Sequence, residues 1–269
     1  MAASPRRSGK LPLLQLLCRR FPELSKDELY ARLLCGEVSV DGAMERDPKA
    51  PFHPDADISF LARHYVSRGG EKLESAFLHM NFPVSGKIFI DAGSSTGGFT
   101  HFLLLKGARN VHAVDVGYNQ LDYRLRSDPR VLVHERTNIL SLTELDPQPQ
   151  AAVGDLSFRS LRGAVGHILS LTGEGWGVFL LKPQFELDAR YHEFNGIVSD
   201  VSILKKTVEQ TLFALAEEAV LTEKICAAGI KGRKGNQEYF VLLRSGSSAN
   251  KPDAYERIRR LLREEFQEL

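Results

Sequence analysis

The sequence predicts an α/β protein in which a doubly wound, mostly parallel sheet follows a smaller α+β domain at the amino terminus. After residue 70, short apolar runs alternate with longer amphipathic stretches, and a glycine-dense loop follows the first of these runs. The first 62 residues instead have the pattern of two helices and a hairpin. We therefore expect a small domain at 1–62, a linker at 63–70, a large domain at 71–246 and a tether with a charged helix at 247–269.

Composition limits the classes of function. The chain has 269 residues, 43% of them hydrophobic, and its 35 basic and 34 acidic side chains nearly cancel to a net charge of +1. Binding to nucleic acid would therefore depend on a local basic patch. The cysteines Cys18, Cys35 and Cys226 show no CxxC spacing, so we expect a reduced cytoplasmic protein with no structural metal. No apolar run is long enough to span a membrane.

The amino-terminal domain opens with two predicted helices within Leu11–Leu34. Ser25 and Glu28 have the spacing of a capping box at the start of the second helix. Residues Glu37–Gly42 then alternate in polarity and end in Asp-Gly, which predicts a hairpin, and another strand is expected at Asp57–Leu61.

Two helices and such a hairpin resemble the S4-type RNA-binding module. That resemblance places RNA contacts on basic side chains of the two helices, which would bind phosphates. The alternative is that these are solvated charges on an accessory domain. The side chains concerned are Arg19, Arg20, Lys26 and Arg32.

The large domain begins with a helix predicted at Glu71–His79. Lys72 falls in its first turn, where a positive charge opposes the helix dipole. The mismatch costs at most about 1 kcal/mol, but it favours a role beyond solvation.

The loop that follows the first strand predicts a ligand site. Ile88–Ile90 forms a buried run that ends at Asp91, and a helix opens near Phe99. The glycines between them allow a sharp turn and a close approach to a ligand. The loop lacks the spacing of a pyrophosphate loop and the Gly-Lys-Ser/Thr of a P-loop, and its acid suits an ammonium group, which favours S-adenosylmethionine. An ordinary turn without a ligand is the alternative. We expect cofactor contacts from Asp91, Gly93, Ser94, Ser95, Thr96, Gly97, Gly98 and Phe99.

Two later positions suit the rest of the cofactor. Asp115 ends the strand predicted at Asn110–Val116, at about the spacing where a carboxylate binds ribose hydroxyls. Asn138 follows the strand Val131–His134, where it would meet an adenine edge. A surface carboxylate and an Asx turn are the respective alternatives.

The next two strands end in charged residues. Ala151–Gly154 is followed by Asp155, and Trp176–Leu181 is followed by Lys182. The carboxyl ends of parallel strands meet at one sheet edge, so both side chains are expected beside the glycine loop. A plain ion pair is the alternative to a chemical role.

The last two strands, Ala219–Ala228 and Tyr239–Leu243, follow a helix at Val198–Glu218 and are joined by a short loop, which makes them antiparallel. The start of the final strand, at Glu238, therefore lies at the ligand edge. The basic residues of the loop are placed to meet phosphates or are simply solvated. These residues are Lys231, Arg233 and Lys234.

Taken together, the motifs resemble the TlyA/hemolysin A family, which joins an S4-type domain to an FtsJ-like, Rossmann-like methyltransferase. The resemblance implies 2′-O-methylation of ribosomal RNA with S-adenosylmethionine, on ribosomal RNA or ribosomal subunits. It also implies a catalytic Lys-Asp-Lys-Glu tetrad at Lys72, Asp155, Lys182 and Glu238, with Asp155 also facing the cofactor and Arg68 joining the RNA contacts. The motifs are Arg68–Leu73, Asp91–Thr100, Val114–Tyr118, Glu135–Asn138, Asp155–Phe158, Leu181–Glu186 and Gly235–Tyr239.

These residue types suit methyl transfer to a ribose hydroxyl. In-line positioning supplies much of the acceleration, and Lys182 would take the hydroxyl proton or stabilise the forming alkoxide. Two other functions stay open. The family's name suggests a membrane-lytic protein, although the helix expected at Asp253–Leu269 is nearly balanced in charge. A non-catalytic RNA-binding regulator is the third reading.

Overall fold

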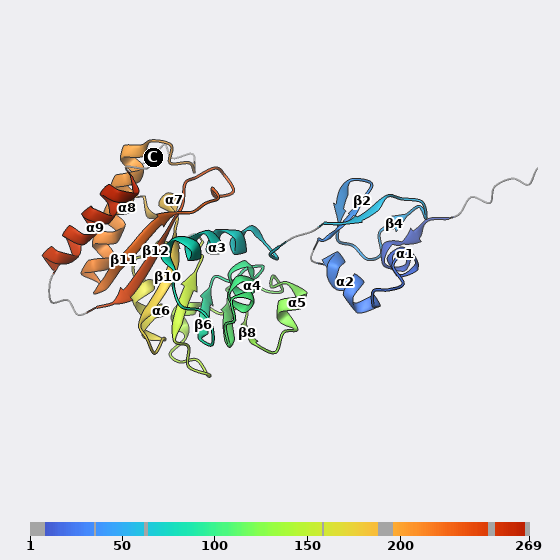
Figure 1. The fold of residues 1–269 in the computed structure, drawn as a ribbon, viewed down its shortest axis with the longest axis horizontal. Helices are drawn as coiled ribbons and strands as arrows, with labels where there is room; N and C mark the ends of the chain where they lie inside the picture. The colour runs from blue at the N-terminus through green and yellow to red at the C-terminus, as the bar shows by residue number, and fades with distance from the viewer. Residues whose placement is uncertain are drawn as a thin grey trace, which may run out of the picture.

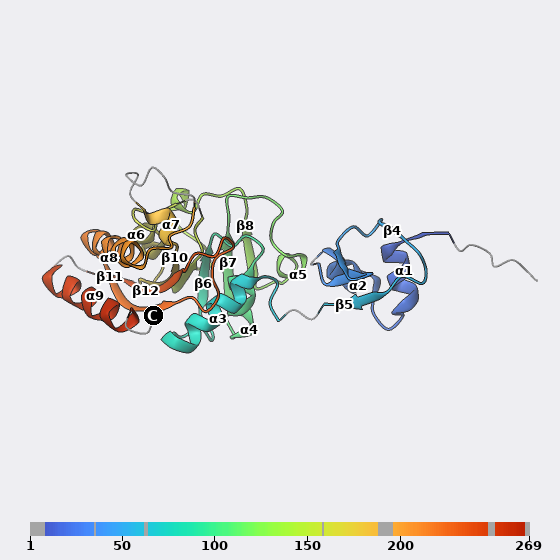
Figure 2. The same cartoon turned by 90° about the horizontal axis from the view of Figure 1, so that it is seen from above.

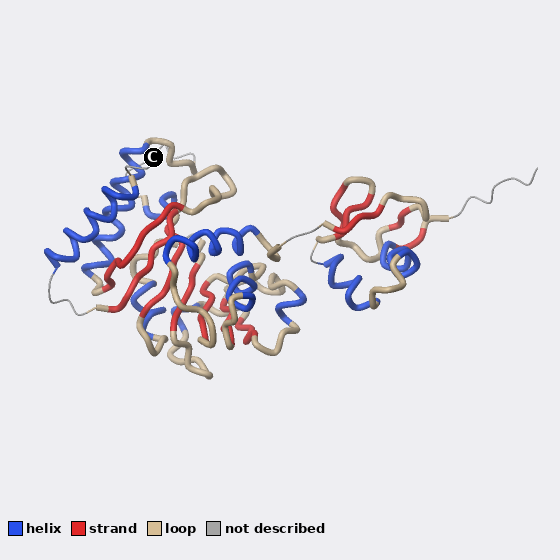
Figure 3. The backbone as a smooth tube through the Cα atoms, viewed as in Figure 1, coloured by secondary structure: helices blue, strands red, loops and turns tan. Residues whose placement is uncertain are grey.

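The computed structural model describes residues 9–34, 36–61, 64–157, 159–187, 196–246 and 251–266. Figures 1 and 2 show a small amino-terminal domain at one end of an elongated molecule and a larger α/β domain at the other. In Figure 3, which colours strands red and helices blue, the strands of each domain can be seen with helices beside them. Phe158 of one predicted motif, residues 62–63 of the domain boundary, residues 247–250 of the predicted tether and the last three residues of the predicted terminal helix lie outside the described residues.

The small domain packs two helices against a three-stranded sheet of order β3-β2-β5, beside a short β1-β4 pair. Its hairpin turns through Asp41 at φ 51° and Gly42 at φ 81°, as the Asp-Gly pair predicts. The Ser25 hydroxyl accepts from the Glu28 amide at 3.2 Å, which is half of the predicted capping box. The elements are β1 (Leu11–Pro12), α1 (Leu13–Arg20), α2 (Lys26–Leu34), β2 (Val38–Val40), β3 (Ala43–Glu45), β4 (Pro51–Phe52) and β5 (Ile58–Phe60). Assignment of this domain to the S4 type stays a prediction.

The large domain is built on a seven-stranded sheet of order β11-β12-β10-β9-β6-β7-β8. Strand β12 is antiparallel to both of its neighbours, and the pairs among β10, β9, β6, β7 and β8 are parallel. The predicted α/β fold with an antiparallel last strand is therefore confirmed. The strands are β6 (Ile88–Ala92), β7 (Asn110–Val114), β8 (Val131–His134), β9 (Ala151–Gly154), β10 (Trp176–Leu181), β11 (Val220–Ala227) and β12 (Tyr239–Ser245).

Helices cover both faces of this sheet. Residues of α3 and α4 share one hydrophobic cluster with the strands, and residues of α6, α8 and α9 share the other. The helices are α3 (Arg68–Met80), α4 (Gly98–Leu105), α5 (Tyr123–Arg126), α6 (Val165–Ser170), α7 (Pro183–Glu186), α8 (Val201–Glu217), α9 (Lys251–Glu265) and the 3₁₀ turn η1 (Ile139–Ser141).

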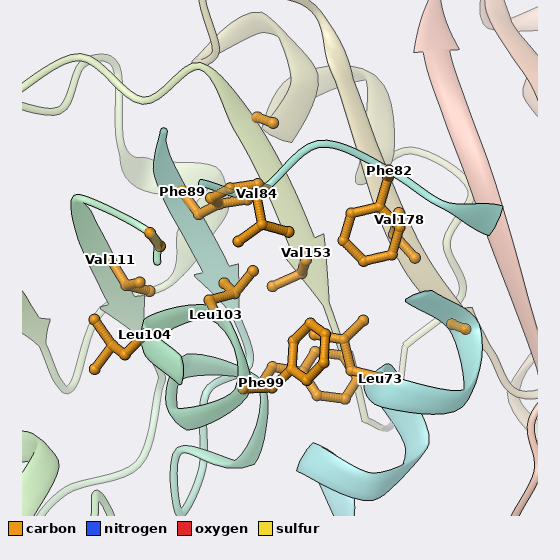
Figure 4. Packing of buried hydrophobic residues seen from close by; sticks show 14 of the residues in the cluster. Leu73, Phe82, Val84, Phe89, Phe99, Leu103, Leu104, Val111, Val153 and Val178 are labelled. Atoms are coloured by element: carbon orange, nitrogen blue, oxygen red, sulfur yellow. The ribbon is translucent and has the colours of Figure 1, made fainter. Parts of the chain in front are cut away.

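Strands β9 and β10 are apolar and buried along their whole length, because both of their faces are covered. Neighbouring residues point to opposite clusters: Phe89 and Val178 lie on the α3/α4 side, and Phe179 lies on the other. Figure 4 shows Phe89, Val153 and Val178 of the sheet in the same hydrophobic cluster as Leu73 of α3 and Phe99 of α4. This packing fixes where each strand ends, and so where the polar residues after it emerge.

The large-domain helix begins earlier than the sequence predicts. Helix α3 starts at Arg68, so residues 68–70 of the expected linker are helical. A Cβ at Gly70 would stand 2.3 Å from the ring of Tyr65, which explains why a glycine lies in this first turn. The short elements α5, α6, α7 and η1 were not predicted, since they have too few residues to show a helical period.

Candidate active site

The glycine loop lies between β6 and α4 at the carboxyl edge of the parallel strands. Gly93 has φ 81°, and a Cβ there would stand 2.7 Å from the Asp155 carbonyl oxygen. Gly97 has φ 90°, and its Cβ would meet Leu125 at 2.3 Å. The two glycines therefore allow the loop to pass tightly between the exit of β9 and helix α5.

Asp91 supports this loop from below. Its side chain is fully buried, and its Oδ2 accepts from the Thr100 amide at 2.9 Å and from the Thr100 hydroxyl at 2.6 Å. Burial raises the pKa of the Asp91 carboxyl to about 7, against the opposing effect of these hydrogen bonds. Asp91 therefore holds the start of α4 through Thr100. It is not among the residues that line the cavity above the loop, whereas the sequence predicted that its carboxylate would lie beside a ligand ammonium group.

A cavity of about 500 Å³ opens above the loop. Five of the residues expected to bind the cofactor line it, and six do not: Asp91, Ser94, Thr96, Gly97, Gly98 and Phe99 shape the loop or the core instead. Further lining residues follow the ends of neighbouring strands and were not singled out from the sequence. The expected lining residues are Gly93, Ser95, Asp115, Asn138 and Asp155, and the additional ones are Val114, Val116, Gly117, Gln120, Thr137, Ile139, Leu156, Ser157 and Arg159.

Asp115 ties two loops of the cavity wall together. Its Oδ2 accepts from the Ser95 amide at 2.8 Å, and its Oδ1 accepts from the Gly117 amide at 2.7 Å. Each carboxylate oxygen can accept a further bond, so the side chain still suits ribose hydroxyls. Asn138 uses its Oδ1 to accept from the Leu140 amide at 3.1 Å. This is the Asx turn that the sequence left open, and the amide nitrogen remains as a donor for a ligand edge.

The cavity fits S-adenosylmethionine in size and chemistry. Val116, Ile139 and Leu156 offer apolar surface for an aromatic base. The carboxylates of Asp115 and Asp155 suit ribose hydroxyls and an ammonium group, and they disfavour a phosphate. No group of three or more His, Cys, Asp or Glu side chains in the described part of the chain could hold a metal ion.

The predicted tetrad residues meet as two ion pairs beside this cavity. Lys182 Nζ lies 2.5 Å from Asp155 Oδ1, across the exits of β10 and β9. Lys72 Nζ lies 2.6 Å from Glu238 Oε2, just before β12. Because α3 begins at Arg68, Lys72 is its fifth residue and lies in the second turn, not in the first turn as the sequence predicted. Both lysines are only 9% exposed. The short distances and the burial make each lysine depend on its carboxylate for charge compensation.

Ser157 joins the tetrad to the cofactor cavity. Its hydroxyl accepts from Lys182 Nζ at 2.9 Å. Ser157 also lines a second cavity of about 440 Å³ together with Lys72, Lys182 and Glu238. The two cavities therefore share a wall at Ser157, and Lys182 lies at that wall. The other residues around the second cavity are Gln184, Phe185, Gly196, Gly232, Arg233, Lys234 and Asn236.

The basic loop before β12 borders the second cavity, as its position in the sequence predicts. Arg233 and Lys234 line the cavity. The backbone carbonyl of Lys231 accepts from Arg68 Nη2 at 2.7 Å, so the two expected RNA contacts Arg68 and Lys231 lie side by side. A Cβ at Gly232 would stand 2.5 Å from Glu238 Oε1, which shows how closely this loop passes the tetrad.

The four basic side chains expected to bind RNA in the small domain differ in their surroundings. Arg20 donates to the carbonyls of Ala56 and Pro54, each at 2.6 Å. Arg32 pairs with Glu28 at 3.0 Å and lies 5.0 Å from the centre of the Phe60 ring. Both arginines therefore contribute to packing of the domain. Arg19 and Lys26 are exposed.

The FtsJ-like methyltransferase family matches residues 65–245, which is most of the large domain. Among curated proteins, hemolysin A of Brachyspira hyodysenteriae is 39% identical over 223 residues, covering 81% of this chain and 92% of that protein. The 16S/23S rRNA (cytidine-2′-O)-methyltransferase TlyA of Mycobacterium tuberculosis is 34% identical over 235 residues, covering 85% of this chain and 88% of the relative.

A solved structure extends the likeness to the whole chain. A hemolysin from Streptococcus thermophilus has 30% sequence identity and a TM-score of 0.67, and the match covers 97% of this chain and 98% of that one. In the described part of the chain, no helix has the length and apolar character to cross a membrane.

Proposed function

Because this chain belongs to the FtsJ-like methyltransferase family, and within it to the TlyA/hemolysin A group, we propose that it methylates the 2′-hydroxyl of ribose in ribosomal RNA. The methyl donor of this family is S-adenosylmethionine. The protein would act in the cytoplasm, where ribosomal subunits are available as substrates.

One observation carries the proposal: two cavities share Ser157, and Lys182 lies at their common wall. A methyl transferase of this kind must bring a bound donor and an acceptor hydroxyl into line. The cavity that contains Asp115 and Asn138 suits the donor. The cavity that contains Lys72, Lys182 and Glu238 suits an acceptor on a polyanion, because Arg233 and Lys234 border it.

The residues of the first cavity would hold the cofactor by its polar groups. Asp115 would accept from the ribose hydroxyls, Asn138 would meet the adenine edge, and Asp155 would face the methionine ammonium. When bound, S-adenosylmethionine supplies a methyl group on a positively charged sulfur, which is already a strong electrophile.

Lys182 is the residue proposed to act on the acceptor hydroxyl. As the oxygen–carbon bond forms and the sulfur–carbon bond breaks, the hydroxyl proton must leave. Lys182 would take that proton if it is present as the neutral amine; as an ammonium it would instead stabilise the oxygen as its negative charge develops, and the proton would pass to solvent. Asp155 and Ser157 aim the Lys182 amine from two sides. Lys72 would add a second positive charge at the acceptor oxygen, with Glu238 compensating it.

The RNA would approach over the basic loop and the exposed basic residues of the small domain. Arg233, Lys234, Arg19 and Lys26 are the side chains best placed to bind phosphates. Arg20 and Arg32 would contribute less, since their guanidinium groups already hold the fold of the small domain.

The test is methyl transfer from labelled S-adenosylmethionine to purified ribosomal subunits and to naked ribosomal RNA. We expect label in RNA with the wild-type protein and at least 100-fold less with Lys182→Ala, since a misplaced or missing catalytic group costs about two orders of magnitude. Lys206→Ala is the matched control, because Lys206 is an exposed lysine of α8 and should retain activity. Resistance of the labelled ribose to alkaline cleavage would identify the 2′-oxygen.

Two outcomes would contradict the proposal. Cofactor binding without transfer to any ribosomal substrate would favour a non-catalytic RNA-binding regulator. Leakage of dye from liposomes at protein concentrations where no transfer occurs would favour a membrane-lytic protein, the activity named in the hemolysin relatives.

A further inference from the structure

Glu186 is a buried carboxylate that the proposed chemistry does not use. It ends helix α7, four residues after Lys182, and is 4% exposed. Its Oε2 accepts from the Ser160 hydroxyl at 2.5 Å, and its Oε1 accepts from the Leu161 amide at 2.7 Å. Arg162 Nε lies 3.4 Å from Oε2, and Arg162 Nη2 donates to the Glu186 carbonyl at 2.7 Å.

These contacts join the two chain segments that carry the Lys182–Asp155 pair. Asp155 follows β9 and Ser160 lies five residues further on, while Lys182 follows β10 and Glu186 ends the next turn. The gap between the segments is therefore bridged at two places. Lys182 bonds to Asp155 and Ser157 at the first, and Glu186 bonds to Ser160, Leu161 and Arg162 at the second.

The segment held in this way also forms part of the cofactor cavity. Leu156, Ser157 and Arg159 lie between the two bridges, and all three line that cavity. Ser157 in addition accepts from Lys182. A movement of this segment would change the position of Ser157, and with it that of Lys182, relative to the cofactor cavity.

A buried charge is a poor means of adding stability, because well-packed apolar side chains of similar volume often serve as well or better. A buried carboxylate instead contributes by positioning its neighbours, because hydrogen bonds from several donors fix the groups around it in one arrangement. The Ser160 hydroxyl and the Leu161 amide donate to the two oxygens of Glu186, and Arg162 Nε lies 3.4 Å from Oε2. Arg162 Nε itself donates to the Ser160 hydroxyl at 3.1 Å, so Glu186 and Ser160 together hold the segment 160–162 in one arrangement.

We propose that Glu186 is a positioning residue for methyl transfer: through Ser160 and Leu161 it holds the segment after Asp155 at a set distance from Lys182. The inference rests on the proposed function, in which Lys182 acts on the acceptor hydroxyl. Glu186 itself lines neither of the two cavities.

Ser160→Ala is the variant that tests this role with least disturbance of the fold. It removes the 2.5 Å bridge and the acceptor of the Arg162 amide and Arg162 Nε, but leaves Glu186 bonded to the Leu161 amide and to Arg162 Nη2 through its carbonyl. We expect the single-turnover rate at saturating RNA and cofactor to fall about tenfold or more, as for other small displacements of a catalytic group. The Kd of S-adenosylhomocysteine and the KM for RNA should change less than about twofold, and Ser160→Thr, which keeps the hydroxyl, should restore the rate.

Thr211→Val is the matched control on the other side of Glu186. The Thr211 hydroxyl lies 3.4 Å from Glu186 Oε2 but donates to the Thr207 carbonyl at 2.9 Å, so its one proton is used within α8. We expect the rate of Thr211→Val to match that of the wild type. Glu186→Gln, which keeps the volume but replaces one acceptor by a donor, should lose rate as Ser160→Ala does.

These measurements distinguish a failure of the proposed function from a failure of the positioning role of Glu186. Absence of transfer by the wild-type protein would contradict the proposed function. An active wild type with an equally active Ser160→Ala, or with an equal loss of rate in Ser160→Ala and Thr211→Val, would overturn the positioning role of Glu186.

Discussion

Lys72 and Glu238 lie 166 positions apart in the sequence, yet Lys72 Nζ and Glu238 Oε2 are 2.6 Å apart in a largely buried pair. The pair connects the second turn of α3 to the residue just before β12. It therefore links the first helix of the large domain to its last strand.

Breaking the Lys72–Glu238 pair should cost both stability and activity. Glu238→Gln leaves the Lys72 ammonium without its carboxylate, and we expect a loss of about 2 to 4 kcal/mol in the free energy of unfolding, because the Lys72 side chain keeps 11% exposure. The double variant Lys72→Met/Glu238→Gln should regain most of that stability but no methyl transfer. Urea denaturation and the transfer assay measure the two effects. Equal stability of the single and double variants would contradict the charge explanation.

Gly232→Ala should separate activity from stability. The added methyl group would stand 2.5 Å from Glu238 Oε1, and the end of a flexible side chain can move aside at little cost. Glu238 would then turn away from Lys72, so we expect at least a tenfold loss of transfer rate with a change in Tm of only a few degrees. Gly166→Ala in α6 is the control, since its added methyl group would meet Val220 at 3.8 Å. Retained activity in Gly232→Ala would show that Glu238 is not needed in its present position.

Asp91 should make stability depend on pH. Its pKa is about 7 in the folded protein and near 3.8 in an unfolded chain, so the folded state holds an extra proton between these values. Stability from this group is therefore highest below about pH 4, falls as pH rises towards 7 and is constant above that. The total effect is at most about 4 kcal/mol. Relative to Asp91→Asn, the wild type should lose stability between pH 5 and pH 8, which denaturant titrations at both pH values would detect; parallel changes in the two proteins would contradict it.

Asp115→Ala should weaken cofactor binding with little effect on the core. The substitution removes the acceptor for Ser95 and Gly117 as well as the proposed partner of the ribose hydroxyls. We expect the Kd of S-adenosylhomocysteine to rise at least tenfold, since hydrogen bonds to a charged group contribute about 1.5 to 3 kcal/mol. Isothermal titration measures this. Asp55→Asn, on an exposed side chain of the small domain, is the control and should bind as the wild type does.

The centre of the large sheet was predictable because strands β9 and β10 are buried on both faces and are uninterrupted apolar runs in the sequence. Strands β9 and β10 have the predicted bounds. The rule that parallel strands end at one edge then brings Asp155 and Lys182 together, as found. Glu238 required one further step, the recognition that β12 is antiparallel and begins at that edge.

The sequence was less informative about what each polar side chain does in the fold. Asp91 and Asp115 both end strands, but only the three-dimensional packing shows that Asp91 is covered by α4 while Asp115 faces the cavity. Arg20 has the same local character as Arg19, yet it bonds to carbonyls more than thirty positions away. Ser157 and Glu186 were within predicted motifs, and their partners lie 25 positions away in segments with no periodic pattern.

Strand β12 lies inside the sheet, between β10 and β11, although it is the last strand in the sequence. During synthesis, every parallel strand therefore leaves the ribosome before the strand that separates β10 from β11 exists. A nascent chain that stops short of residue 238 exposes the edge of β10 and leaves the Lys72 charge without its carboxylate. Insertion of β12 thus completes the sheet and brings Glu238 to Lys72 in the same final step. Truncated products of translation would have no methyl transfer activity, and their exposed strand edge would make them targets of proteolysis.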